Sequence, residues 1–267
     1  MLAIQFVSDS DIKFARAMIP GISDSSPASS EICENGQNYA WSSSPYHIKI
    51  FARQDLLVQP FLPELRTVIN ASYRDHDINP IGKIGHRIQY DTQVVHEIGS
   101  SGFTAVTFAS NEIVGTASVR DWVPEADGIV WKLDGYYAGK SADEAGSMQA
   151  VGSNSNSAVS DTATCEGDFE IFLVAVKPGE KYRKKGIAER LVKACEEEIK
   201  RQIGQKLVQP AQKNHLSIML KVVREINGEY WLKKGFKIMG ECYCPPFTWD
   251  LEKAFVLWAM RKELPIS

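Results

Sequence analysis

The chain has 267 residues, of which 44% are hydrophobic, a formal net charge of −3 and a pI near 6.0. A chain of this length and composition can bury one large core or two small ones, so we expect a globular protein. Binding to nucleic acid or to an anionic membrane usually needs a broad basic field, which this charge balance does not supply. We therefore expect no nucleic-acid partner and no membrane partner, and any anion site must be local.

Residues 1–44 predict an irregular N-terminal extension, because they are rich in Ser, Asn and Gly after one short apolar run. They lack the charged start and continuous apolar stretch of a secretory leader, and the chain nowhere reaches the roughly 18 apolar residues of a membrane span. These features predict a cytoplasmic protein.

The chain contains five cysteines and five histidines. The cysteines are odd in number and lack the spacing of a disulfide framework, so most are expected to be buried thiols. Cys242 and Cys244 would face the same way on a strand, but a metal site needs further ligands, and the histidines show no ligand spacing. We expect no metal.

Beyond the extension, the sequence predicts alternating strands and helices. Alternating apolar residues predict a strand over 47–54, and the following apolar-rich stretch predicts a helix over 56–77 that Pro60 or Pro63 interrupts. A short helix is expected within 91–102, between an Asp at its start and a Gly at its end.

Two β-rich runs separated by the turn signal "ASNE" predict a hairpin over 102–122. The composition then changes, because residues 123–167 contain few bulky apolar side chains and many Ser, Asn, Ala and Gly. We expect this segment to be a long, flexible insertion between strands.

Regular elements return at "FEIFLVAV" (169–176), whose nearly continuous apolar character is typical of a central strand buried on both faces. A helix is predicted over 186–203, because apolar residues recur there at helical spacing. The remaining predicted elements are a strand over 216–223, a short helix over 228–235, a strand over 236–244 and a segment over 253–264 that fits strand or helix alike.

The stretch "RKKGIA" joins the strand 169–176 to the helix that follows. A loop that opens a helix presents free backbone N–H groups, and the helix dipole adds partial positive charge. Gly186 lets a ligand approach the backbone, and Ala188 leaves room beside it. The neighbouring cations can pair with phosphate oxygens: Arg183, Lys184 and Lys185. The pattern predicts a phosphate-binding loop, and the alternative is a charge run that only solubilises the start of a helix.

This region resembles the acetyl-CoA signature of the GNAT superfamily of N-acetyltransferases, Arg/Gln-x-x-Gly-x-Gly/Ala after a buried strand and at the start of an amphipathic helix. The stretch "YWLKKGFKIMG" (230–240) is similar to the family's short helix followed by Gly-Phe. The resemblance covers roughly residues 46–263. It implies a GNAT-like fold of the mixed α/β (α+β) class over residues 45–267, with a twisted, mostly antiparallel central sheet of about seven strands flanked by about four helices.

The resemblance also implies acetyl-CoA as the co-substrate. In the family, the strands that correspond to 169–176 and 216–223 splay apart, and unpaired backbone groups of the first bind pantetheine. The matching positions here are Val174, Ala175 and Val176. The positions that would hold the pyrophosphate, mainly through backbone amides, are Arg183, Lys184, Lys185, Gly186, Ile187 and Ala188.

Three features depart from the family pattern. The loop between Pro178 and Arg183 is longer, and Arg224 replaces an Asn that often contacts pantetheine. Trp231 stands where a Tyr commonly protonates the departing thiolate; Tyr230 is the adjacent candidate acid, although helical neighbours point about 100° apart. The departures keep two alternatives open, a GNAT-like enzyme repurposed as a lyase or cyclase and a non-catalytic ligand-binding module.

Glu170 is the candidate general base. It lies in an otherwise apolar strand, and a carboxylate in such surroundings binds a proton more readily, which suits removal of a proton from an amine near neutral pH. Some family members carry a catalytic Glu at the equivalent position. The alternative is that Glu170 lies at a solvated entrance and pairs with a Lys or Arg.

Two loops are candidates for the acceptor pocket. Phe247 and Trp249 lie in a Pro-containing loop and can form one wall. In many relatives the opposite wall follows the first helix, where Asp75 and Asp77 can attract an amine, although solvated loop charges are equally expected. The implied function is direct transfer of an acetyl group to an amine of a small molecule or peptide, by a monomer or homodimer. A specialised tailoring or detoxifying role, as in fungal secondary metabolism, is expected.

Overall fold

Among the described residues, eight strands form one sheet in the order β1-β2-β3-β4-β5-β6-β8-β7, and neighbouring strands are antiparallel except β5 and β6. The strands are β1 (Gln37–Tyr39), β2 (Tyr46–Ala52), β3 (Phe103–Ala109), β4 (Glu112–Asp121), β5 (Phe169–Val176), β6 (His215–Val223), β7 (Lys237–Cys244) and β8 (Phe255–Pro265). The helices are α2 (Arg53–Leu57), α3 (Leu62–Arg74), α4 (Gln93–Glu97), α5 (Ala142–Val151), α6 (Ile187–Lys206) and α7 (Glu229–Lys233), with a π-helical turn η1 (Arg224–Gly228) and a 3-10 turn η2 (Thr248–Asp250). The computed structural model describes residues 37–39, 45–75, 79–83, 85–122, 131–132, 135–151, 169–206 and 215–265, which belong to the unit Cys33–Ser267.

The predicted mixed α/β class with a mostly antiparallel sheet is confirmed. The seven predicted strands are β2 to β8, and the last segment is a strand. The helix predicted over 56–77 is interrupted near its prolines: α2 ends at Leu57, and α3 begins at Leu62 with Pro63 in its first turn. The other predicted helices correspond to α4, α6 and α7. Within the predicted N-terminal extension, β1 pairs with β2, and the rest lies outside the described residues.

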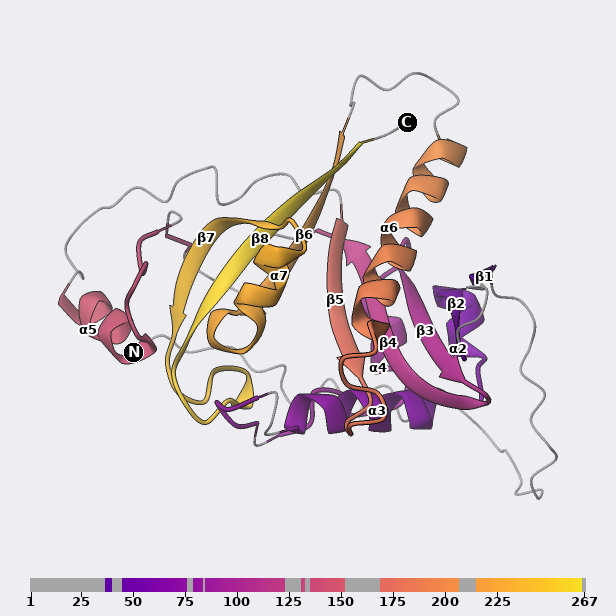
Figure 1. The fold of residues 1–267 in the computed structure, drawn as a ribbon, viewed down its shortest axis with the longest axis horizontal. Coiled ribbons are helices and arrows are strands. Elements are labelled where there is room, and N and C mark those ends of the chain that lie inside the picture. The colour runs from indigo at the N-terminus through magenta and orange to yellow at the C-terminus, as the bar shows by residue number, and fades with distance from the viewer. Residues whose placement is uncertain are drawn as a thin grey trace, which may run out of the picture. The chain divides into compact units, whose positions relative to one another are not determined.

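Helices cover both faces of the sheet (Figure 1). α6 packs against β3, β4 and β5, and its apolar stripe of Leu191, Cys195 and Ile199 is fully buried. α2, α3 and α4 lie over the opposite face, where Leu65 and Ile69 of α3 are fully buried in a second cluster. Apolar residues three or four positions apart give each helix one buried side, which explains why these segments fold against the sheet.

Helix α5 lies inside the predicted insertion 123–167 and was missed, because its sequence "ADEAGSMQAV" lacks a regular apolar stripe. It packs against β7 and β8 through small residues. A Cβ atom at Gly146 would lie 2.7 Å from the hydroxyl oxygen of Tyr243 on β7, so glycine permits this close approach. Residues 123–130, 133–134 and 152–168 lie outside the described part of the insertion.

Glu241 on β7 joins this segment to the sheet. Its side chain is 2% exposed, and its two oxygens accept hydrogen bonds from the Tyr137 backbone N–H at 2.7 Å and from Trp258 Nε1 at 2.9 Å. Its backbone N–H and C=O pair with those of Lys132 at 2.9 and 2.7 Å. A carboxylate buried beside two donors therefore fixes the insertion against the edge strand of the sheet.

Replacing Glu241 tests this anchor. Glu241→Leu leaves two buried donors without an acceptor, and we expect it to lower the free energy of unfolding by about 2–5 kcal/mol, with a smaller loss for Glu241→Gln. Urea denaturation followed by circular dichroism measures the change. Glu229→Leu, at an exposed position of α7, is the control, and an equal loss in both Leu variants would contradict the anchor.

Candidate functional site

Strands β5 and β6 separate soon after they meet. They pair at only two positions, Phe169 with Ile218 and Glu170 with Met219, although β5 continues to Val176 and β6 to Val223. Figure 1 shows β6, β8 and β7 diverging from β5 beyond this point. The predicted splay is confirmed, and it opens the sheet between its two halves.

A β-bulge in β5 accompanies the separation. Leu173 and Val174 together oppose Ala117 of β4, between the pairs Phe172–Ser118 and Ala175–Thr116. Leu173 has a φ of 52°, a left-handed conformation that costs a non-glycine residue about 1–3 kcal/mol. Because the bulge breaks the alternation of side chains, the neighbours Phe172 and Leu173 both pack on the α3 side of the sheet.

Among the described residues, no strand pairs with the edge of β5 that faces the gap beyond Glu170. The Lys177 N–H donates to Val114 of β4 at 2.9 Å, so the backbone of Lys177 faces β4. Since backbone groups alternate along a strand, the N–H and C=O of Val176 face the other way, toward the gap. A ligand that lies in the gap can use them as a further strand would.

The loop after β5 is held by Glu112 at the start of β4. Its carboxylate accepts a hydrogen bond from Lys177 Nζ and a second one from the Tyr182 hydroxyl, which lies at 2.6 Å. The additional loop residues form a turn in which the Tyr182 and Arg183 N–H groups donate to Gly179 O. The longer loop is therefore an anchored turn that leads directly into α6.

Gly186 precedes α6 with a φ of 73°, and space is open where its side chain would be. Lys184 and Lys185 are exposed, whereas Ile187 is buried in the core and only its backbone remains for a ligand. Arg183 pairs with Asp75 at the end of α3. The backbone at the start of α6 is therefore open to an anion, and the two lysines are the exposed cations next to it.

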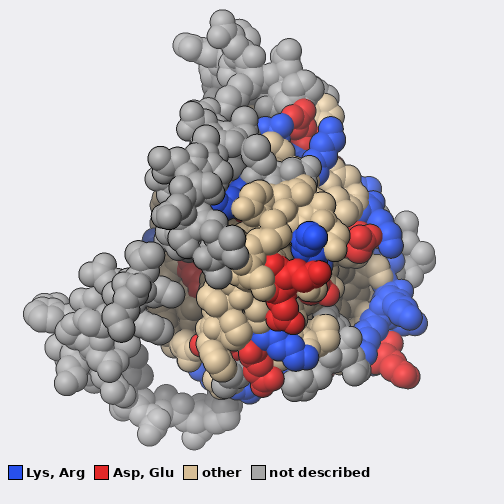
Figure 2. Space-filling model, turned by 90° about the vertical axis from the view of Figure 1, so that its left-hand side faces the viewer, with Lys and Arg blue, Asp and Glu red and all other residues tan. Residues whose placement is uncertain are grey.

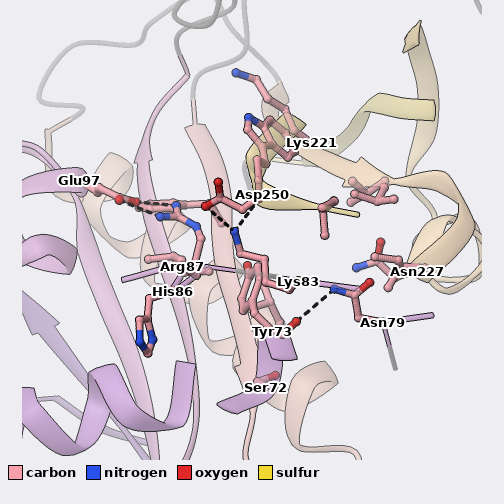
Figure 3. A pocket seen from close by; sticks show the side chains of 18 of the residues that line it. Ser72, Tyr73, Asn79, Lys83, His86, Arg87, Glu97, Lys221, Asn227 and Asp250 are labelled. Carbon is pink, nitrogen blue, oxygen red and sulfur yellow. Dashed lines mark hydrogen bonds and ion pairs between the residues drawn. The ribbon is translucent and has the colours of Figure 1, made fainter. Parts of the chain in front are cut away.

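A cleft of about 710 Å³ lies beside the separated strands (Figure 3). Its lining includes Glu170 and Val174 of β5, Val223 of β6, Tyr73 of α3 and Trp249 of η2. The structure thus brings together residues predicted separately as catalytic, cofactor-binding and substrate-binding.

Other predicted acceptor residues lie elsewhere. Asp75 is held by Arg183 and does not belong to the cleft lining, so its predicted contact with an amine is replaced by an ion pair to the loop before α6. Phe247 is 69% exposed, has a left-handed backbone conformation and does not belong to the cleft lining. Asp77 lies outside the described residues.

Glu170 is buried and forms an ion pair. It is 2% exposed, and its Oε2 accepts a hydrogen bond from Arg120 Nε at 2.7 Å. The alternative of pairing with an Arg is correct, but the carboxylate is buried in the wall of the cleft and does not lie at a solvated entrance. Arg120 was missed in the sequence; it lies opposite Glu170 in the β4–β5 register, so a cross-strand pair of opposite charges was the available signal.

A second ion pair lines the cleft nearby. Arg87 donates to both oxygens of Glu97, at 2.9 and 2.7 Å, and Gln93 also donates to Glu97. Burial alone would raise the pKa of Glu97, but the hydrogen bonds and charge of Arg87 outweigh burial and hold this pKa below its ordinary value. No sequence motif surrounds these residues, which come from a loop and a short helix.

Lys83 forms hydrogen bonds to the loop that carries Phe247 and Trp249, on the other side of the cleft. Its Nζ donates to the Trp249 carbonyl at 2.5 Å and to Asp250 Oδ2 at 3.3 Å. Burial lowers the pKa of Lys83, against the opposing effect of Asp250. Trp249 and Asp250 both have left-handed backbone conformations, with φ of 53° and 56°. The lysine therefore holds a strained segment that positions Trp249 in the cleft.

Arg224 and Trp231, the two residues that depart from the family pattern, have structural roles. Arg224 donates to the carbonyls of Tyr137 and Lys140, at 3.2 and 2.8 Å, and so fastens the segment before α5. Trp231 is 4% exposed and packs in the core against Phe236. Tyr230 is half-buried beside it and lies outside the cleft lining. Burial raises the pKa of Tyr230, and its role as an acid stays a prediction.

The described part of the chain contains no cluster of three His, Cys, Asp or Glu side chains that could hold a metal ion. None of its helices combines the length and apolar character needed to cross a bilayer. On the described part of the face in Figure 2, Lys and Arg lie close to Asp and Glu.

No protein-family model and no curated protein matches the sequence. Solved structures that align with the chain include a GNAT-family acetyltransferase from Streptococcus pneumoniae (13% identity, 82% of this chain and 99% of that chain, TM-score 0.45). Others are Arabidopsis thaliana NAA60 in complex with acetyl-CoA (16%, 82% and 98%, TM-score 0.42) and aminoglycoside 6'-acetyltransferase type Ii (14%, 82% and 97%, TM-score 0.41). These are similarities of fold at low identity, and no substrate of this chain follows from them.

The Arg87–Glu97 pair predicts a pH-dependent contribution to stability. Because the folded-state pKa of Glu97 lies below its unfolded value of 4.5, the contribution is present above 4.5 and is lost as pH falls through the folded-state value. We expect Glu97→Gln to lower the free energy of unfolding by about 1–3 kcal/mol at about pH 7, and by less at about pH 3.5.

Urea denaturation at the two pH values measures this difference. Glu197→Gln is the matched control, because Glu197 forms an exposed pair with Lys200 at 3.4 Å and should cost less than about 0.5 kcal/mol. If Glu97→Gln lowers the free energy of unfolding by the same amount at both pH values, the ion pair is not the source of the loss.

Proposed function

We propose that this protein is a GNAT-type N-acetyltransferase that moves an acetyl group from acetyl-CoA to an amine. The observation that carries the proposal is the opening between β5 and β6, which leaves the edge of β5 unpaired directly before the loop that starts α6. One extended ligand with a peptide-like arm and a pyrophosphate can follow both features. Acetyl-CoA has this form.

In this proposal the pantetheine arm lies along Val174, Ala175 and Val176 and forms backbone hydrogen bonds as an added strand. The pyrophosphate lies at the start of α6, against the amides around Gly186. A helix of 20 residues supplies its dipole there, and the open side of Gly186 leaves room for phosphate oxygens. Lys184 and Lys185 add charge from the solvent side.

The acceptor amine occupies the cleft, on the other side of the thioester. Its nitrogen attacks the acetyl carbonyl carbon, the carbon–sulfur bond breaks, and CoA leaves as a thiolate. Glu170 accepts the proton that the amine loses, while Arg120 holds the carboxylate in place. The amine belongs to a small molecule or peptide, and transfer occurs directly within the ternary complex.

The cofactor site is tested by Gly186→Glu. A carboxylate at this position would enter the space for the pyrophosphate and repel it, so we expect acetyl-CoA affinity to fall at least 30-fold in isothermal titration calorimetry. Gly139→Glu is the matched control, because Gly139 also has a left-handed φ, 68°, and open space around it. Equal affinity in the two variants, or no binding by the wild type at millimolar acetyl-CoA, would contradict the proposal.

The role of Glu170 is tested by Glu170→Gln. The amide cannot accept the proton, so we expect turnover on an accepted amine to fall at least tenfold, with unchanged acetyl-CoA binding. Release of free CoA thiol measures turnover. Glu196→Gln is the control, because Glu196 on α6 is a largely buried acid that pairs with Lys262 of β8. Unchanged turnover in Glu170→Gln would remove Glu170 as the base, and acetyl-CoA binding without thiol release on any amine would favour a binding module.

A further inference from the structure

Arg120 uses one edge of its guanidinium group within the protein. Nε donates to Glu170, and the group lies over the Phe172 ring, 4.4 Å from its centre. Among the described residues, Nη1 and Nη2 have no hydrogen-bond partner, although Arg120 lines the cleft and its side chain is only 30% exposed. In Arg87, by contrast, both Nη atoms donate hydrogen bonds to Glu97.

We infer that Arg120 binds a carboxylate of the acceptor, and that the acceptor is an α-amino acid. This inference rests on the proposed acetyl transfer and names its substrate class. A guanidinium group fixed through Nε and stacked on a ring has lost its rotamer freedom, so its remaining edge is preorganised for a planar, bidentate anion. A carboxylate matches that edge.

The charge of the cleft favours a ligand group that carries a single negative charge. With histidine counted as neutral, the described lining contains four cations and three carboxylates, which leaves one positive charge: Lys83, Arg87, Arg120 and Lys221 against Glu97, Glu170 and Asp250. A carboxylate balances this excess. A phosphate monoester carries about −1.5 to −2 at neutral pH and would leave negative charge in the cleft.

The position of Glu170 sets the distance between the amine and the carboxylate of the acceptor. Arg120 and Glu170 touch, so a ligand with its carboxylate on Arg120 and its amine beside Glu170 must carry the two groups close together. In an α-amino acid one carbon separates them. Asn227 supplies a further polar atom, since its Oδ1 is buried, has no hydrogen-bond partner in the described part of the chain, and belongs to a residue that lines the cleft. Figure 3 shows Asn227 on the opposite side from Arg87 and Glu97.

The test compares the twenty common amino acids with their carboxamides as acceptors for the wild-type protein. Thiol release gives kcat/KM for each, and calorimetry without acetyl-CoA gives the affinity for each. We expect at least one amino acid to exceed its carboxamide at least 30-fold in both measurements, since the carboxamide lacks the charge that Arg120 pairs with. A carboxamide that equals its acid throughout overturns the inference and leaves acetyl transfer intact.

Variants assign the preference to Arg120. Arg120→Gln should reduce the ratio of acid to carboxamide to less than threefold, and Arg120→Lys, which keeps a charge for Glu170, should leave it intermediate. Arg261→Gln is the control, because Arg261 has a similar side-chain exposure of 29% and pairs with Glu263 away from the cleft. Unchanged acetyl-CoA affinity shows that a variant is folded. A ratio that survives in Arg120→Gln overturns the assignment.

The two proposals fail separately. If no amino acid releases thiol but another amine does, acetyl transfer stands and the inference is overturned. If no amine of either kind releases thiol, the proposed acetyl transfer fails, and calorimetry still decides whether Arg120 binds carboxylates. Carboxylate binding that is lost in Arg120→Gln then supports the site, and equal binding of acid and carboxamide overturns it.

Discussion

The early separation of β5 from β6 is the constraint on which the site depends. Parallel strands that pair at only two positions leave most of β5 with one free edge inside the sheet. Glu170 is the last residue of β5 that pairs with β6, so its ion pair with Arg120 lies where these two strands part. The charged groups of the cleft and the free backbone edge therefore meet at one place. Charge is tolerated there because Glu170 and Glu97 each have a guanidinium partner, Arg120 and Arg87.

The loop before α6 connects this opening to the rest of the protein. Glu112 ties the loop to the β3–β4 hairpin, and the Arg183–Asp75 pair ties it to the end of α3. The last turn of α3 also lines the cleft. The Arg183–Asp75 pair therefore links the loop before α6 to a helix that contributes to the cleft. The exposed lysines contribute charge, but the anchored backbone determines the shape of the loop.

The sequence predicted most of the fold, because periodicity and glycine positions are local properties. These local patterns predicted the strand "FEIFLVAV", the helix after Gly186 and the hairpin around "ASNE". Helix α5 was not, since it packs through Ala145 and Gly146 and has no apolar stripe. The cleft was the least predictable part. Arg87, Glu97 and Lys83 come from segments without motifs, and only the tertiary arrangement brings them to Glu170.

The Lys132–Glu241 bridge also covers part of the outer edge of the sheet. β7 is the last strand of the sheet, and the outer edge of such a strand offers unpaired backbone groups to any other strand. The bridge occupies part of that edge, and Lys132 carries a charge that another sheet would have to bury. The bridge thus shortens the open edge with which another strand could pair.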